Sequence, residues 1–190
     1  MLWKVHSEKP LYTDPWLDVR LADVELFDGR RLQHRVIRTA PKAGAVVTDI
    51  RDRVLLIWRH RFITDSWGWE IPLCAIDEGE DFAAAAGRGF ESASGWRPGP
   101  LRPLLCVQPS NGTSDSVHHV YRADTASYVS AAPRPADAER VDWIPVQSLP
   151  GLIDLGDVVD GTTLASLLYL LAEQPLPERR GRLAVRPPWM

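Results

Sequence analysis

The stretch from residue 69 to residue 96 constrains the fold more than any other part of the chain. It follows two apolar runs, residues 44–48 and 54–58, that predict buried strands. After an acidic loop, residues 81–94 predict an alanine-rich helix that ends at Gly95, a residue suited to a helix C-cap. Strands and helices in this order predict an α/β domain, which we place at residues 41–174.

The segments on either side complete the prediction. Apolar residues between 16 and 37, interrupted by Asp28-Gly29, predict a β-hairpin, so residues 1–40 are expected to form an N-terminal arm. Further strands are predicted over residues 101–107, 117–121 and 141–146, and a helix over residues 162–172 with Asp160 as its N-cap. Residues 175–190 are rich in proline and arginine and are expected to form a tail.

Composition excludes several classes of protein. The 190 residues carry 22 basic and 25 acidic side chains, and this net charge of −3 argues against a general nucleic-acid binder. No apolar run approaches the ~20 residues that span a bilayer, so no membrane-spanning segment is expected. The first residues lack the apolar core of a secretory signal, and two cysteines make no disulfide framework. A cytoplasmic protein is expected.

A family resemblance follows from residues 69–96, which read WEIPLCAIDEGEDFAAAAGRGFESASGW. They resemble the Nudix box, G-x5-E-x7-R-E-U-x-E-E-x-G-U, where U is a bulky apolar residue. Glu80 matches the first glutamate, Arg88 the arginine and Gly95 the second glycine, while Cys74 stands at the first glycine. The flanking residues are similar to the ADP-ribose pyrophosphatase branch. This resemblance implies a Nudix fold, in which a mixed β-sheet lies between α-helices, and a homodimer joined through the arm.

The box lacks three of its four glutamates. Gly89 replaces the glutamate that follows the arginine, and Ser92 and Ala93 replace the Glu-Glu pair. In the family these positions supply carboxylates to Mg²⁺ or Mn²⁺, which offsets phosphate charge and activates water. Hard cations need several oxygen ligands. Glu80 alone therefore predicts at most a weak Mg²⁺ or Mn²⁺ site, and Glu80 and Arg88 remain as remnants of the catalytic set.

Other residues are candidates for binding a ligand. Arg59 and Arg61 alternate along a strand and can form an anion clamp, or they are strand-end arginines in water. Trp67 and Trp69 can stack on a base or pack in the core. Three further candidates are Asp115, His119 and Glu139; each can also be an ordinary structural or surface residue. Because His118 and His119 are neighbours on a strand, at most one faces the cleft.

Three functions are compatible with these residues. The first is a Nudix-fold pseudoenzyme that has lost pyrophosphohydrolase activity and binds a nucleotide, a nucleotide-sugar or a partner. The second is a divalent-metal-dependent hydrolase of nucleoside diphosphate derivatives with altered ligands. The third is a repurposed enzyme that needs no metal and uses Cys74, His60, His119 or Asp115. We rank them in that order.

Overall fold

The computed structural model describes residues 2–130 and 138–173. The first strands are β1 (Lys4–Thr13), β2 (Asp18–Glu25), β3 (Arg31–Arg38), β4 (Lys42–Val47), β5 (Arg53–Arg61), β6 (Ser66–Glu70) and β7 (Leu73–Ala75), followed by helix α1 (Phe82–Ser94). Then come β8 (Trp96–Pro98), β9 (Arg102–Val107), β10 (His118–Ala123), β11 (Ala126–Tyr128) and β12 (Ala138–Pro145). The short 3₁₀ helix η1 (Val146–Ser148), α2 (Leu149–Asp154) and α3 (Gly161–Glu173) complete the described chain.

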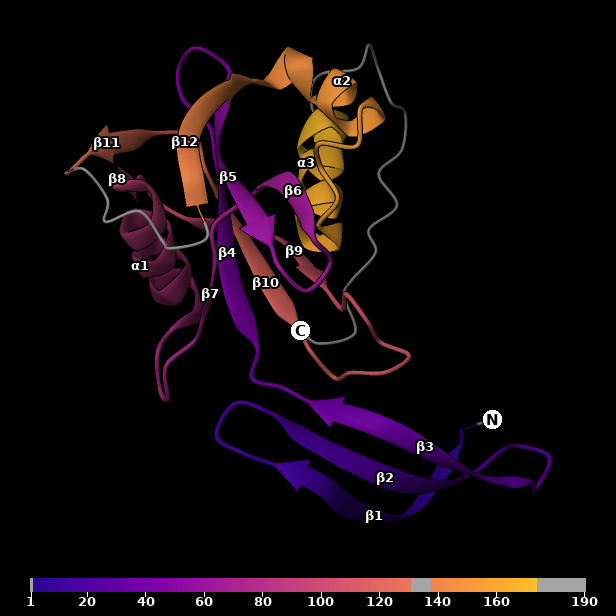
Figure 1. Cartoon of the computed structure of the whole chain (residues 1–190). Helices are drawn as coiled ribbons and strands as arrows, with labels where there is room; N and C mark the ends of the chain where they lie inside the picture. Colours follow the sequence, from indigo (N-terminus) through magenta and orange to yellow (C-terminus); the bar gives the residue numbers. More distant parts are fainter. Residues whose placement is uncertain (1, 131–137, 174–190) are drawn as a thin grey trace.

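Two sheets form the centre of the molecule and helices cover them on opposite sides (Figure 1). The first sheet has the order β7-β4-β10-β9 and is mixed, because β10 pairs parallel with β4 and antiparallel with β9. The second has the order β12-β5-β6 and is antiparallel. Helix α1 lies on one side and α3 on the other, so the predicted mixed sheet between helices is confirmed.

Strand β5 explains why residues 54–58 are continuously apolar. Val54 and Leu56 belong to a core cluster that includes Leu167 of α3, whereas Leu55 belongs to a second cluster with Phe90 of α1. Alternate side chains of a strand point to opposite faces. Both faces of β5 are therefore buried, and neither can carry polar residues without loss of packing.

The predicted caps Gly95 and Asp160 are confirmed, whereas α1 begins one residue later than predicted, at Phe82, with Asp81 as its N-cap. The Asp81 side chain accepts hydrogen bonds from the backbone N–H groups of Ala83 and Ala84, each at 3.0 Å, which caps the N-terminus of α1. Gly95 has φ 77°, the left-handed conformation that favours glycine at a C-cap. In α3, the Asp160 carboxylate accepts from the backbone N–H of Thr163 at 2.7 Å.

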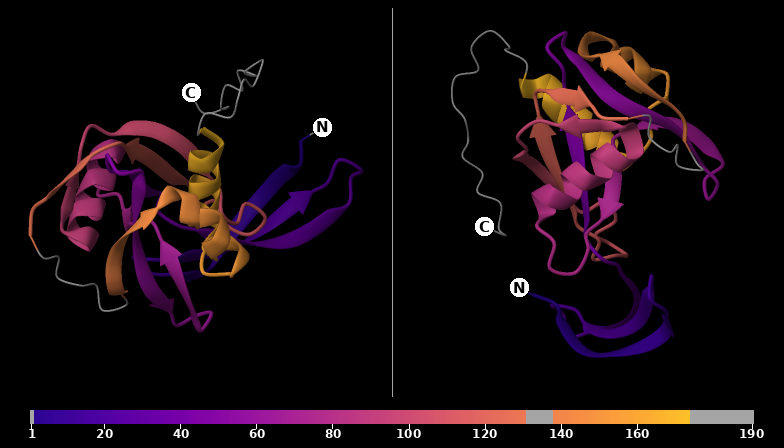
Figure 2. Two further views of the ribbon diagram at one scale, coloured as in Figure 1. Left: turned by 90° about the horizontal axis from the view of Figure 1, so that it is seen from above. Right: turned by 90° about the vertical axis from the view of Figure 1, so that its left-hand side faces the viewer.

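The N-terminal arm has three strands rather than the two of the predicted hairpin. β2 and β3 form that hairpin, and β1 pairs antiparallel with β2 on the other side. β1 escaped prediction because nearly all its side chains are exposed and no apolar alternation marks it. Its pairing is irregular between Val5 and Ser7 and between Pro10 and Tyr12, as expected at a sheet edge. The three strands form a curved sheet below the main body (Figure 2).

The arm is fastened to the loop between β9 and β10. The backbone N–H of Ile37 donates to the Thr113 carbonyl at 2.8 Å, and that of Asp115 donates to the Ile37 carbonyl at 3.2 Å. Arg38 adds a hydrogen bond from its guanidinium to the Asp115 carboxylate at 3.2 Å. Strand β3 therefore fixes where this loop presents its polar side chains. None of the helices in residues 2–130 and 138–173 combines the length and apolar character that a membrane crossing requires.

Candidate functional site

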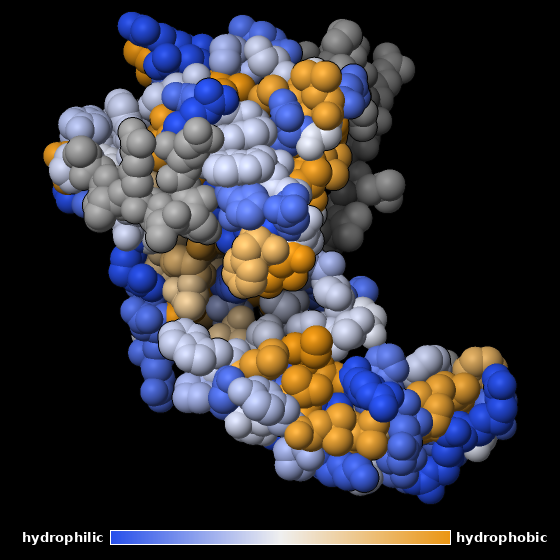
Figure 3. Space-filling view, in the orientation of Figure 1, coloured by the Kyte–Doolittle hydropathy of each residue, from blue (hydrophilic) through white to orange (hydrophobic). Residues whose placement is uncertain are grey.

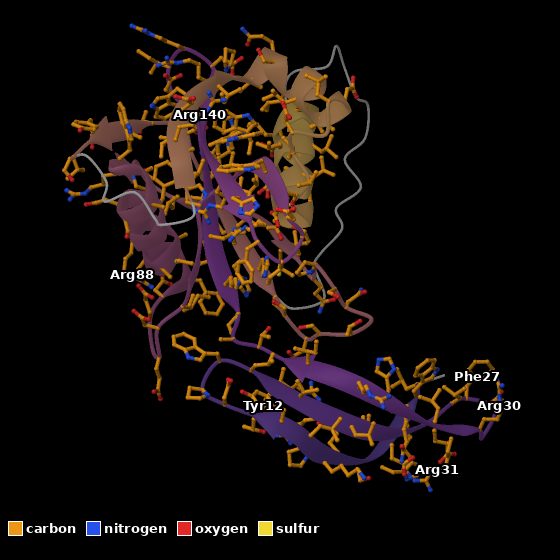
Figure 4. The ribbon with its side chains drawn as sticks, viewed as in Figure 1. Tyr12, Phe27, Arg30, Arg31, Arg88 and Arg140 are labelled. Carbon is orange, nitrogen blue, oxygen red and sulfur yellow. The ribbon has the colours of Figure 1, made fainter. Side chains whose placement is uncertain are left out.

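Glu80 and Arg88, the remnants of the box, bind each other. The Arg88 guanidinium donates to both carboxylate oxygens of Glu80, at 2.8 Å and 2.7 Å, and also to the Ala75 carbonyl at 3.0 Å. Hydrogen bonds from Arg88 and from the Asp77 backbone lower the pKa of Glu80 to about 2. Figure 4 shows Arg88 beside α1 and its preceding loop. Glu80 is therefore an ionised carboxylate that already accepts three hydrogen bonds.

The Gly89 position has no room for a side chain. A Cβ atom built there would lie 2.5 Å from the Cys74 Sγ atom and 2.8 Å from the Cys74 Cβ atom. Cys74, on β7, directs its thiol toward α1, where it donates to the Ala85 carbonyl at 3.2 Å. The family pattern has glycine at position 74 and glutamate at position 89. In this chain the larger residue is at 74 and the glycine is at 89. The sequence displays both changes, but only the structure shows that one excludes the other.

The residues around α1 do not fit a catalytic divalent cation. Ser92 is exposed and Ala93 half-buried, and neither carries a charge. Asp81 is occupied as the helix cap, and Asp77 lies 3.5 Å from the Arg88 guanidinium. Within residues 2–130 and 138–173, no three acidic, histidine or cysteine side chains gather as a metal site would need. Glu139 lies on β12, and its side chain is outside the described part of the structure.

Arg59 and Arg61 share one face of β5, as predicted, and both approach Glu70 of β6. Arg61 donates from Nε to Glu70 Oε1 at 2.8 Å and from Nη2 to Oε2, while Arg59 Nη1 lies 3.9 Å from Glu70 Oε2. The Glu70 side chain is only 5% exposed, whereas that of Arg61 is 45% exposed. Arg59 and Arg61 thus both face Glu70, and the Arg61 side chain is partly exposed to solvent.

Trp67 and Trp69 belong to an aromatic stack on the same pair of strands. Both rings contact Trp58 of β5, at centroid distances of 6.2 Å and 5.2 Å. Trp69 is buried, so core packing accounts for it, whereas Trp67 is 46% exposed and also contacts His60. The Arg140 guanidinium of β12 lies over the Trp69 ring at 4.8 Å, and Figure 4 places Arg140 far from Arg88. Trp67 is the member of this pair that a ligand can reach.

Asp115 and His119 line one cavity of about 430 Å³. The cavity is bounded by the connection from β3 to β4, by β9 and β10, and by the first turn of α1. His118 points the other way, is buried, and hydrogen bonds to Thr162 at 2.8 Å and to Ser116 at 3.2 Å. The prediction that at most one of the two histidines faces a cleft is therefore confirmed. Burial lowers the pKa of both imidazoles, which favours their neutral form.

The predicted site residues thus fall into three groups: Glu80 with Arg88, Arg59 and Arg61 with the two tryptophans, and Asp115 with His119. Sequence reasoning missed Phe82 and Gln108, which line the same cavity as His119. Phe82 sits at a variable position of the box. Gln108 sits in a turn-rich segment where many polar residues look alike, so neither had a signal of its own.

Known proteins resemble the chain over most of its length. Residues 3–37 match the N-terminal domain of nucleoside diphosphate sugar hydrolases, and residues 38–166 match the NUDIX domain. The CMP-5'-(N-acetyl-N-hydroxy-3-aminopropyl)phosphonate hydrolase of Streptomyces rubellomurinus (strain ATCC 31215) is 38% identical over 171 residues, which cover 90% of this chain and 83% of that protein. The ADP-ribose pyrophosphatase of Bacillus subtilis (strain 168) is 20% identical over 179 residues, 93% of this chain and 97% of that one.

A solved structure resembles the fold. An ADP compounds hydrolase superposes with a TM-score of 0.77 at 17% sequence identity, covering 90% of this chain and 94% of its own. Identity at that level establishes the arrangement of strands and helices, and leaves the chemistry to the residues of the site.

Proposed function

Since the chain belongs to the Nudix family, of the nucleoside diphosphate sugar and ADP-ribose type, we propose that it binds such a compound without hydrolysing it through a divalent metal. The family reaction needs a cation held by several carboxylates near the diphosphate. This chain supplies one of the four box glutamates, Glu80, and Arg88 already engages that carboxylate. The protein is therefore a binder that has lost its catalytic metal.

The packing of Cys74 against Gly89 carries this proposal. A glutamate at position 89 needs space for its Cβ atom beside β7. The Cys74 thiol lies there, because its Sγ atom would be 2.5 Å from any Cβ at position 89. Burial also raises the pKa of this thiol, so it remains protonated and is a poor metal ligand or nucleophile.

The capacity to bind rests on other residues. Arg59 and Arg61 lie side by side on β5, and the Arg61 side chain is 45% exposed, so its guanidinium can approach an anionic phosphate group. The cavity beside Asp115 and His119 is of the size typical of small-molecule sites. Neither feature uses positions 89, 92 or 93.

The experiment measures hydrolysis and binding of ADP-ribose in the native protein and in a restored variant. Restoring the box requires Cys74→Gly together with Gly89→Glu, Ser92→Glu and Ala93→Glu, because the glutamate at 89 cannot enter while Cys74 remains. The variant that keeps Cys74 and changes the other three residues is the matched control. Each protein is assayed with Mg²⁺ and with Mn²⁺, and binding is measured by calorimetry.

We expect the native protein to bind ADP-ribose without turnover and the fourfold variant to gain metal-dependent turnover. The threefold control should be less stable and inactive. Metal-dependent turnover by the native protein, at a rate comparable to the restored variant, would contradict the proposal. Failure of the native protein to bind ADP-ribose or any other nucleoside diphosphate compound would contradict it too.

The second candidate is a divalent-metal-dependent hydrolase with altered ligands. The observation in its favour is the 38% identity to a hydrolase of a CMP-linked phosphonate over 90% of this chain. If this candidate is correct, the native protein hydrolyses its substrate and Glu80→Gln abolishes that turnover. If the first candidate is correct, the native protein shows no turnover, so Glu80→Gln changes none. A metal-free enzyme is the third candidate, and its proposed nucleophile Cys74 is opposed by the raised pKa of that thiol.

We further propose that a second copy of the chain covers the arm. Large apolar side chains on and beside the arm strands are exposed, among them Trp3 at 58%, Tyr12 at 55% and Trp16 at 86%. Figure 3 shows apolar surface gathered over the arm. Exposed patches of this kind commonly mark contacts between proteins. Analytical ultracentrifugation should give a dimer that Trp16→Asp weakens and Ile50→Asp, a change at an exposed apolar residue outside the arm, leaves intact.

A further inference from the structure

The cavity that holds Asp115 and His119 has one aromatic wall. Phe82, the first residue of α1, packs against His119 of β10 with ring centroids 4.4 Å apart and an angle of 43° between the rings. Phe82 is 36% exposed, so its ring presents surface to the cavity. Burial lowers the pKa of His119, and a neutral imidazole adds flat apolar surface without adding charge. A planar ligand ring can stack on such a wall.

The cavity lining carries a single negative charge. Among the described residues that line it, Asp115 alone is charged. Its carboxylate accepts from the Thr39 backbone N–H at 3.1 Å and from the Arg38 guanidinium at 3.2 Å, which fix its orientation. A carboxylate has about four acceptor positions, so these bonds leave others open, and the side chain is 41% exposed. Gln108 adds an amide that both donates and accepts.

From these observations we infer that the cavity binds a nucleobase carrying an exocyclic amino group, as in cytosine or adenine, with the amino group donating to Asp115. This inference rests on the proposed function and names the part of the nucleotide that the cavity takes. A carboxylate repels phosphate, so the cavity suits the base rather than the diphosphate. Its volume of about 430 Å³ is sufficient for a base and part of its ribose.

Asp115 would also discriminate between bases. Uracil and hypoxanthine place a carbonyl oxygen where cytosine and adenine place the amino group. Two acceptors would then face each other, and the carboxylate would lose water without gaining a hydrogen bond. A site that hydrogen bonds one ligand group rejects the analogue that lacks it more strongly than apolar packing does.

Calorimetric titration with CMP, UMP, AMP and IMP tests this. Each pair differs at the amino position and shares ribose and phosphate. We expect CMP to bind about tenfold more tightly than UMP, and AMP about tenfold more tightly than IMP, from one hydrogen bond to a charged group. Asp115→Asn should remove this preference, because the amide offers both a donor and an acceptor. The matched control is Asp124→Asn, which also removes an aspartate paired with arginine, at 2.5 Å from Arg102, but lies outside the cavity.

The aromatic wall is tested separately. Phe82→Leu should weaken all four nucleotides by a similar factor of roughly tenfold, since loss of stacking on one aromatic ring does not depend on base edges. Phe62→Leu, at an exposed residue outside the cavity, should change nothing. Equal binding of amino and keto bases by the native protein would overturn the inference, as would a preference that survives Asp115→Asn.

The two proposals can fail independently. Hydrolysis of ADP-ribose by the native protein would overturn the proposed function, whereas the base preference is measured with mononucleotides that contain no diphosphate. Binding of ADP-ribose without any binding of CMP or AMP would overturn the base cavity and leave the proposed function standing.

Discussion

Two glutamate–arginine pairs in this protein differ in burial. Glu80 and Arg88 lie on the loop and helix of the box, and their side chains are 18% and 45% exposed. Glu70, paired with Arg59 and Arg61, is only 5% exposed, and Arg59 is 9% exposed. The box has the surface pair but lacks the three glutamates that the family pattern has at positions 89, 92 and 93. The paired strands β5 and β6 have kept charges in the interior.

This difference in burial distinguishes the box, which binds the metal in the family, from the arginine cluster of β5 and β6. Clustered carboxylates repel one another, so they are costly without a cation, and small neutral residues at 89, 92 and 93 relieve that cost. A buried carboxylate with two arginines also carries a desolvation cost, and apolar residues would commonly stabilise the fold as well or better. The cluster on β5 and β6 keeps its charges despite this cost, whereas under the proposed function the box binds no cation.

The largest effect is expected at the buried cluster. Glu70→Gln keeps the shape of the side chain but removes the buried negative charge that faces Arg59 and Arg61. Removing one partner of a buried ion pair costs about 3–5 kcal/mol, and because Arg61 is 45% exposed we expect a loss near the lower figure. Urea unfolding at neutral pH measures it.

The control for this variant is Glu91→Gln, which removes the partner of Arg97 at the surface. That pair is made at 2.8 Å, but the Arg97 side chain is 63% exposed. We expect a much smaller loss, because water screens the pair. Equal losses in the two variants would remove the distinction between buried and surface pairs on which the comparison depends.

The next effect concerns two glycines of the same helix. Gly89→Ala should destabilise the protein by about 1–3 kcal/mol, as overpacking does, because its Cβ would lie 2.5 Å from the Cys74 Sγ atom. Gly87→Ala should instead stabilise it by up to about 1 kcal/mol through helix propensity, because its Cβ would meet Leu101 at an ordinary 3.5 Å. Thermal unfolding of the two variants gives opposite signs.

The cause of the Gly89→Ala effect is tested by making the same change in a protein that also carries Cys74→Gly. With the thiol removed, Gly89→Ala should become neutral or stabilising, so that the two positions show strong coupling in a double-mutant cycle. If Gly89→Ala is equally harmful with and without Cys74, the thiol is not what excludes a side chain there. The proposal that Cys74 excludes a glutamate at position 89 would then lose its support.

Most of the fold could be predicted from local patterns. The run from 54 to 58 and the capped helix from Asp81 to Gly95 each carry a periodicity or an end signal of their own. Strand β1 has neither a periodicity nor an end signal, because it is an exposed edge strand. It forms by pairing with β2. Edge strands of this kind are specified by their neighbour rather than by their own composition.

The site was less predictable, because its properties arise between elements. The motif revealed the loss of three glutamates, and strand alternation placed Arg59 with Arg61 and separated His118 from His119. The clash between positions 74 and 89 depends on the contact of β7 with α1. The cavity joins Phe82 of α1 to His119 of β10, residues with no spacing relationship in the sequence.

The smallest effect is expected from the surface pair of the box, and its pH dependence sharpens the comparison. The pKa of Glu80 is lowered from its usual 4.5 to about 2 by the hydrogen bonds from Arg88 and the Asp77 backbone. A carboxyl whose pKa is lower in the folded state than in the unfolded state stabilises the folded state at pH values above the unfolded-state pKa. This contribution disappears as the pH falls to the folded-state pKa. The stability difference between the native protein and Glu80→Gln should therefore be full above pH 4.5 and vanish toward pH 2.

Urea unfolding at several pH values between 7 and 2.5 measures that difference, with Glu78→Gln as the control, because Glu78 makes no ion pair within the described residues. Salt at about 1 M should also reduce the Glu80 effect, since screening acts on exposed pairs, while the effect of Glu70→Gln should persist. If the stability difference caused by Glu80→Gln changes neither with pH nor with salt, this carboxylate contributes through something other than its ionic bond to Arg88. The box would then retain a structural role for Glu80 that its surface position does not suggest, and the contrast with Glu70 would be one of degree.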